Sequence, residues 1–251
     1  MIASLAMYDW PEQSGHWDVF WDILRESLRA RGIAAPEALS RGGDPDDDWT
    51  SPDLVIGQTC GLPYRARLAD RVTLLGALDH GLPGCAPGYY NSVVIMGADD
   101  RRDIGAALSG TVAYNAPDSQ SGWAAICDLA DTCGTAIVSA TLSDSHRVSA
   151  RLVAGGAADI ATIDAETWRL VERHDRDVAA GLRVADRTPA RPGLPLISRA
   201  GVDPAPYAAA IAEAVDATPE AIRDALDLRG FATIAPDAYL SLPLPPAPPG
   251  A

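Results

Sequence analysis

The chain has 251 residues, of which 47% are hydrophobic, so it can bury a sizeable core and is not a disordered chain. Its 34 acidic residues outnumber 20 basic ones, and the resulting net charge of −14 disfavours nucleic acid and anionic membranes as partners. Every basic residue is arginine, so a Schiff-base lysine and a P-loop are both excluded.

The apolar start of the chain predicts a buried strand rather than a targeting segment. Residues 2–7 are too few for the apolar region of a secretion signal, and no basic residues precede them. Arg, Asp, Gly or Pro interrupts every apolar stretch before it reaches the length of a membrane span. We therefore expect a soluble protein, not inserted in a membrane, that is cytoplasmic as written or periplasmic if a leader has been removed.

Short apolar runs alternate with amphipathic stretches, which is typical of α/β architecture. The first helix is predicted at residues 16–31, with one apolar face and Gly32 as its stop signal. That face consists of Trp17, Phe20, Trp21, Leu24 and Leu28. Strands in this first part of the chain are predicted at residues 2–7, 53–57 and 72–78.

The same alternation continues after a Pro/Gly-rich stretch at residues 81–88. Extended segments or strands are predicted at residues 92–96, 111–115, 136–141, 159–163, 182–185 and 196–198. Helices are predicted at residues 100–108, 121–132, 145–154, 204–215 and 219–228, and through residues 167 and 171. The Pro-rich tail, residues 242–251, is expected to be frayed.

Two breaks rich in Pro and Gly divide the chain into three parts. We expect residues 1–88 and 190–251 to form a discontinuous first lobe, with residues 93–185 inserted as a second lobe. Residues 89–92 and 186–189 are then the two crossings of a hinge. Each lobe is expected to be a mainly parallel sheet flanked by helices, with ligands bound beyond the carboxyl ends of the strands.

The segment from Tyr114 to Trp123 carries the strongest local signal for a binding site. A predicted strand ends at Asn115, Ser119 and Ser121 follow, and a helix starts near Ser121. Backbone N–H groups at a helix start have no intrahelical acceptor and hold anions, and serine hydroxyls add donors. The alternative is that Ser121 is only an ordinary helix N-cap.

Two further strand ends carry polar groups. His146 stands near the start of a predicted helix, where it can donate to an oxyanion or serve as a structural hydrogen-bond partner. Asp164 ends a predicted strand, and its carboxylate can cap the next helix or accept a proton from the ligand. In the first lobe and at the crossing, Tyr8, Thr59 and Tyr90 are candidates to line the same site.

Several segments together resemble the phosphate, phosphite and phosphonate substrate-binding family of ABC transporters, which has the type II periplasmic-binding-protein fold. The segments are residues 7–12, 53–64, 85–92, 115–122, 145–149, 153–164, 188 and 192–196. The resemblance implies a protein that binds a small phosphorus oxyanion between two lobes by hinge closure, and that serves an ABC permease without being an enzyme. No cofactor or metal is expected.

The resemblance also implies which side chains contact the ligand. The family's anion pocket corresponds to Ser119, Gln120 and Ser121, and its histidine corresponds to His146. Tyr8, Tyr90 and Thr59 are the matching residues from the first lobe and the crossing, and Asp164 is a further candidate.

Other functions stay open at this stage. Ser121, His146 and Asp164 are the residue types of a hydrolase triad, although the segment around Ser121 is not a Gly-x-Ser-x-Gly elbow. A cytoplasmic ligand sensor or a partner-binding module on the same fold is another alternative. The four histidines have no metal-ligand spacing. Cys60 and Cys85 either form a disulfide or are small buried thiols.

Overall fold

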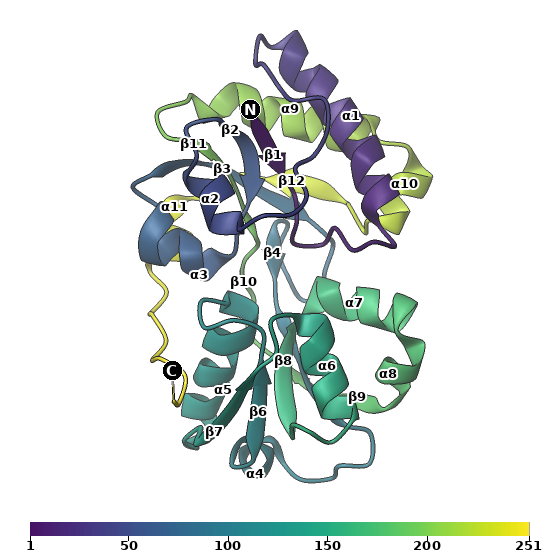
Figure 1. Ribbon diagram of the computed structural model, residues 1–251, viewed down its shortest axis with the longest axis vertical. Coiled ribbons are helices and arrows are strands. Elements are labelled where there is room, and N and C mark those ends of the chain that lie inside the picture. Colours follow the sequence, from purple (N-terminus) through teal and green to yellow (C-terminus); the bar gives the residue numbers. More distant parts are fainter. Residues whose placement is uncertain (251) are drawn as a thin grey trace. The chain divides into compact units, whose positions relative to one another are not determined.

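The computed structural model describes residues 1–250, which divide into two compact units (Figure 1). Unit 1 comprises residues 1–89 and 192–242, and unit 2 comprises residues 90–191 together with the tail from Pro243. The chain therefore changes unit three times, because the tail leaves unit 1 after Leu242. The sequence pattern predicts the whole of residues 190–251 in the first lobe. The tail differs because its backbone supplies a hydrogen-bond acceptor to a buried tryptophan of unit 2, as described below.

Unit 1 is a five-stranded sheet with helices packed on it. The strands follow the order β1-β2-β11-β3-β12, and two of them, β11 and β12, come from the last part of the chain. The strands are β1 (Ile2–Ser4), β2 (Leu54–Gln58), β3 (Val72–Asp79), β11 (Pro195–Arg199) and β12 (Gly230–Ala232). The helices are α1 (Ser14–Ala30), α2 (Pro45–Thr50), α3 (Gly61–Pro63), the π-helical turn η1 (Tyr64–Leu68), α9 (Pro204–Ala217), α10 (Glu220–Ala225) and α11 (Pro236–Leu240).

Unit 2 is a second five-stranded sheet, in the order β7-β6-β8-β5-β9. Its strands are β5 (Ser92–Gly97), β6 (Thr111–Tyr114), β7 (Ser139–Leu142), β8 (Ile160–Asp164) and β9 (Leu182–Arg187). Its helices are α4 (Ile104–Leu108), the π-helical turn η2 (Gln120–Ala124), α5 (Ala125–Cys133), α6 (His146–Ala154), α7 (Ala165–His174) and α8 (Arg176–Ala180). Two short strands, β4 (Tyr89–Tyr90) and β10 (Arg191–Pro192), lie where the chain changes unit.

The α/β class is confirmed, but the sheets are mixed rather than mainly parallel. In unit 1, β11 runs antiparallel to both β2 and β3, and β12 runs antiparallel to β3. In unit 2, β5 is antiparallel to β8 and β9, while β6 is parallel to β7 and β8. Strands β5 and β11 are the first full strands after the chain enters a unit. A helical crossover within one sheet makes the strands that it joins parallel. The chain reaches β5 and β11 from the other unit instead, so this constraint does not apply to them.

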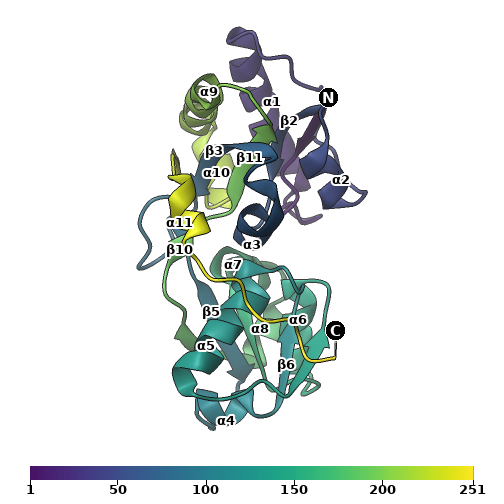
Figure 2. The same cartoon turned by 90° about the vertical axis from the view of Figure 1, so that its left-hand side faces the viewer.

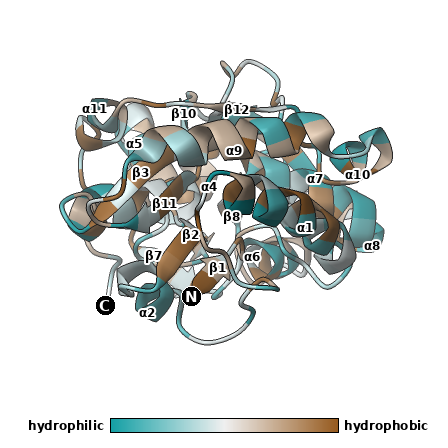
Figure 3. Cartoon of the chain, turned by 90° about the horizontal axis from the view of Figure 1, so that it is seen from above, coloured by the Kyte–Doolittle hydropathy of each residue, from teal (hydrophilic) through white to brown (hydrophobic). Residues whose placement is uncertain are grey.

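The apolar face predicted for the first helix is confirmed. Trp17, Phe20, Trp21, Leu24 and Leu28 are all buried on α1. The helix ends as expected at Gly32, whose φ of +74° is the left-handed conformation that glycine adopts without strain. Seen from above, α1 shows brown apolar stretches between teal polar ones, and β2 is brown (Figure 3).

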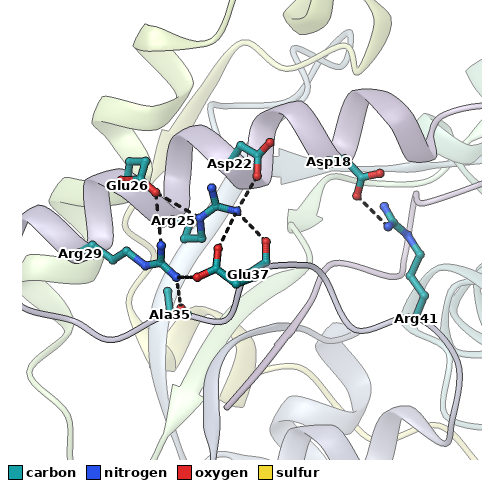
Figure 4. Close-up of polar contacts among 8 residues, drawn as sticks. All are labelled: Asp18, Asp22, Arg25, Glu26, Arg29, Ala35, Glu37 and Arg41. Atoms are coloured by element: carbon teal, nitrogen blue, oxygen red, sulfur yellow. Dashed lines mark hydrogen bonds and ion pairs between the residues drawn. The ribbon is translucent and has the colours of Figure 1, made fainter.

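A network of ion pairs fastens the loop after α1 to the helix (Figure 4). Arg29 lies 2.6 Å from a carboxylate oxygen of Glu37 and donates to the carbonyl oxygen of Ala35 at 2.8 Å. Arg25 donates to Asp22 and to the backbone of Glu37, each at 2.6 Å. These arginines hold the loop against the polar side of α1, while the apolar side packs in the core.

The core of unit 2 places the helix η2–α5 against the sheet. Trp123, Ile126, Cys127 and Ala130 pack against side chains of β5, β6 and β8. The indole N–H of Trp123 donates to the carbonyl oxygen of Pro246 at 2.6 Å, so the tail is fixed on this unit rather than frayed. Figures 1 and 2 show the yellow tail leading away from α11 to the C-terminal end.

The sequence left two alternatives for Cys60 and Cys85, and the structure of unit 1 decides between them. Cys60 and Cys85 are half-buried thiols that no disulfide joins. Within residues 1–250, no helix is both long and apolar enough to cross a membrane.

Candidate functional site

The site predicted at residues 119–121 forms at the start of η2, where β6 has just ended. After β6, the amide of Ser119 donates to the carbonyl oxygen of Ala116 and closes a tight turn through Pro117. Ser119 is the N-cap, because its Oγ accepts a hydrogen bond from the amide of Gly122 at 2.9 Å. The helix therefore begins earlier than the sequence indicated. The capping role falls to Ser119, and the side chain of Ser121 is left for another contact.

The first turn is a π-helical turn held in place by hydroxyls of the sheet. The amide of Ala124 donates to the carbonyl oxygen of Ser119 at 2.9 Å, a spacing of five residues. Ser92 on β5 donates to the carbonyl oxygen of Ser121 at 2.9 Å. Thr162 on β8 donates to the carbonyl oxygen of Gly122 at 2.8 Å. Strands β5 and β8 thus hold the turn by its carbonyl oxygens. The amide N–H groups of a helical turn point in the opposite direction, toward the start of the helix.

Ser121 and His146, which follow the ends of β6 and β7, are brought together in unit 2. Ser121 Oγ lies 2.8 Å from His146 Nε2. His146 is the first residue of α6, and Ser145 caps that helix by accepting a hydrogen bond from the amide of Val148. The side chain of His146 is half-buried, while its Nδ1 atom is fully buried and has no hydrogen-bond partner.

Burial lowers the pKa of His146 to about 3, so its imidazole is neutral at pH 7. Between pH 6.5 and 3, the unfolded chain binds a proton at this residue that the folded chain does not bind. This residue therefore makes the fold less stable as the pH falls through that range.

We expect the His146→Gln variant to lose less stability on acidification than the wild type. Urea unfolding at pH 7.5 and pH 5 measures the change in the free energy of unfolding for each protein. Three carboxyl groups with lowered pKa values are common to both proteins and cancel in the comparison. Arginines lower the pKa values of Asp100 and Asp175, and the amide of Thr111, followed by Arg102, lowers that of Asp159. Equal pH dependence in the two proteins would contradict a lowered pKa and a neutral imidazole at His146.

Asp164 takes the structural role that the sequence had left open. It ends β8 and caps α7, with its Oδ1 atom accepting from the amides of Glu166 at 2.8 Å and Thr167 at 3.1 Å. Because His146 Nδ1 has no hydrogen-bond partner, no carboxylate orients the imidazole. The hydrolase triad of Ser121, His146 and Asp164 is therefore not formed.

A cavity of about 320 Å³ in unit 2 lies beside the start of η2. Three predicted site residues, Tyr90, Gln120 and Ser121, are among the side chains that line it. The end of β9 and the crossing segment also line the cavity. Thr188 joins this segment to β5, because its hydroxyl oxygen accepts a hydrogen bond from the amide of Ser92 at 2.9 Å.

Arg187, which no motif in the sequence indicates, adds a positive charge to this cavity. It lines the same cavity as Ser121, and its guanidinium makes no ion pair within residues 1–250. Arg191 also lines the cavity but is paired with Asp128 at 3.1 Å. The signal in the sequence was the position of Arg187 within the predicted crossing at residues 186–189.

The two predicted site residues of unit 1 lie after the first two strands of its sheet. Tyr8 follows β1, is buried, and contacts the ring of His80 edge-on at 5.0 Å between ring centroids. Thr59 follows β2 immediately before α3. It is fully buried, and its hydroxyl has no hydrogen-bond partner. Whether Tyr8 and Thr59 act with the residues of unit 2 stays a prediction.

A family model described as the periplasmic phosphonate substrate-binding protein of an ABC transporter matches residues 57–239. The chain belongs to this family. Its members are binding proteins of transport systems and not enzymes. No curated protein matches the chain in sequence, and no cluster of metal-ligating side chains is present within residues 1–250.

Solved structures share the fold of this phosphonate-binding family member. PhnD1 from Prochlorococcus marinus, in complex with methylphosphonate, has a TM-score of 0.69 and 14% identity, with 91% of each chain covered. A binding protein component of an ABC phosphonate transporter from Pseudomonas aeruginosa has a TM-score of 0.68 and 19% identity, over 94% of this chain and 82% of that one.

A third structure shows that the fold accommodates different ligands. XAC2383 from Xanthomonas citri, bound to ATP, has a TM-score of 0.67 and 16% identity, with 90% of each chain covered. At these identities the likeness concerns the fold alone. The ligand must therefore be inferred from the residues of this chain.

Proposed function

We propose that this protein binds a small phosphorus oxyanion, a phosphonate, phosphate or phosphite, at the start of η2 as the solute-binding component of ABC-type uptake. The observation that supports this most is the place of Ser121. Ser121 lies at the N-terminal end of a helix and lines a cavity together with Gln120 and Arg187, whose guanidinium makes no ion pair among the described residues.

Local groups offset the repulsion of an anion by a chain with a net charge of −14. The helix start offers amide donors and the positive end of its dipole, and the hydroxyls of Ser119 and Ser121 add neutral donors. Arg187 adds a full positive charge. Micromolar binding needs about 8 kcal/mol, which several hydrogen bonds to a charged ligand supply at about 1.5–3 kcal/mol each.

Hinge closure is the second part of the proposal. Tyr8 and Thr59 belong to unit 1, and we propose that they reach the anion when the two units close on it. The buried Thr59 hydroxyl, which has no protein partner, supports a role in ligand contact. Small-angle X-ray scattering with and without the anion tests closure, because the radius of gyration falls if the units close.

We expect the Ser121→Ala variant to bind the oxyanion at least about tenfold more weakly than the wild type, since one donor worth about 1.5 kcal/mol is lost. Calorimetric titration with phosphate, phosphite, methylphosphonate and 2-aminoethylphosphonate measures the affinities, with sulfate as the oxyanion that lacks phosphorus.

The matched control is Ser109→Ala, which removes an exposed serine of the same unit at the end of α4. It should bind as the wild type does. If none of the four phosphorus oxyanions gives a heat signal with the wild type, the proposed function is wrong.

A further inference from the structure

Each of the two serines at the start of η2 has its oxygen next to a nitrogen of the protein. Ser119 Oγ accepts from the amide of Gly122 at 2.9 Å, and Ser121 Oγ lies 2.8 Å from His146 Nε2. A serine hydroxyl has one proton to donate and two lone pairs that accept. Ser119 accepts from the protein, so its own proton is available to a ligand. For Ser121, the same depends on which atom donates in its contact with His146.

The surroundings of His146 decide the direction of that hydrogen bond. A neutral imidazole carries one proton, on either Nδ1 or Nε2. Nδ1 is buried with no hydrogen-bond partner, so a proton placed there would be a buried donor without an acceptor. Nε2 has an acceptor within reach in Ser121 Oγ. The proton therefore belongs on Nε2, and His146 donates to Ser121.

We propose that His146 is a positioning residue: its Nε2–H group donates to Ser121 Oγ and so directs the Ser121 hydroxyl proton to the bound oxyanion. This inference rests on the proposed function. It differs from the role expected from the sequence, in which His146 itself donates to the anion. If the bond ran the other way, Ser121 would spend its proton on His146 and present lone pairs to the anion, which repel it.

The arrangement makes the two serines equivalent as donors. Ser119 accepts a hydrogen bond from the amide of Gly122 and Ser121 accepts one from His146, so the protein uses neither hydroxyl proton and each serine has an O–H group to donate to a ligand. Two such O–H groups suit a deprotonated phosphoryl oxygen, which accepts a hydrogen bond from each of them.

A double-mutant cycle with methylphosphonate as the probe tests the proposal. The dissociation constant is measured by calorimetry for the wild type, Ser121→Ala, His146→Leu and the double variant. We expect His146→Leu to weaken binding about tenfold in the wild-type background and less than about twofold in the Ser121→Ala background. In addition, His146→Gln, whose side-chain amide extends about as far as Nε2, should retain affinity within about threefold of the wild type.

Equal losses from His146→Leu in both backgrounds would overturn the proposal, because they would show that His146 contacts the anion directly. Nitrogen NMR of the wild-type imidazole gives a second measurement that needs no variant to fold. A proton on Nε2 supports the proposal, and a proton on Nδ1 overturns it. If the wild type binds no oxyanion, the proposed function fails, and the NMR result still decides the direction of the bond.

Discussion

The Gly122→Ala variant is expected to lose oxyanion binding and part of its stability. A Cβ atom at this position would lie 1.9 Å from Asn115 Oδ1 and 3.1 Å from Ser119 Oγ. Either the Asn115 side chain or the π-helical turn must move. Overpacking of this kind costs about 1–3 kcal/mol of unfolding free energy. Because the amide of Gly122 also donates to Ser119, movement of the turn displaces both serines, and we expect binding to fall more than about a hundredfold.

Two matched variants separate this steric effect from the general cost of replacing glycine. Gly105→Ala in α4 places its Cβ atom no closer than 3.4 Å to any neighbour and should leave stability and binding unchanged. Adding Asn115→Ala to Gly122→Ala removes the clashing oxygen, which has no hydrogen-bond partner, and should restore most of the affinity. Calorimetry and urea unfolding measure both effects. Wild-type affinity in Gly122→Ala alone would show that the close approach of Asn115 is unimportant.

Truncation after Leu242 is expected to destabilise unit 2 and to leave unit 1 largely intact. The truncated chain lacks Pro246, whose carbonyl oxygen accepts from the indole N–H of Trp123, a residue only 1% exposed. A buried donor without its acceptor costs about 1–3 kcal/mol. Pro248, also buried, is lost with it. Hydrogen exchange followed by mass spectrometry should show faster exchange in peptides from α5, with peptides from β2 unchanged.

A shorter truncation after Pro248 is the control, because it keeps both Pro246 and Pro248. This variant should exchange at the wild-type rate in α5. If both truncations leave α5 protected, Trp123 finds another acceptor and the tail has no stabilising role. If β2 loses protection as much as α5, the effect is global and the tail does not act on unit 2 specifically.

The sequence predicted the fold class and the place of the helix start because both depend on local signals. Buried strands followed by Ser, Thr or Asp and then by an amphipathic stretch mark the ends of strands in α/β folds. That pattern places Ser119, Ser121, His146 and Asp164 after strand ends. It could not assign their contacts, because Ser119 and Ser121 are both acceptable N-caps, and only the π-helical turn determines which one caps.

Features that depend on distant parts of the chain were missed for a physical reason. The antiparallel strands β5 and β11 follow from the path of the chain between units, which no local pattern records. No motif in the sequence distinguishes Arg187 from the other arginines. Its position in the wall of the cavity becomes visible only in the folded structure. The proline-rich tail was expected to fray because its composition forms no helix or strand. Its carbonyl groups nevertheless act as acceptors for a buried indole.

The divided composition of unit 2 has a consequence for biosynthesis. A chain emerging from the ribosome presents residues 90–191 well before the segment around Pro246 has been translated. During that interval the indole N–H of Trp123 has no acceptor from the tail. The packing of unit 2 is therefore complete only after the last residues have been synthesised. The helix that bears Ser119 and Ser121 therefore reaches its final stability only near the end of translation.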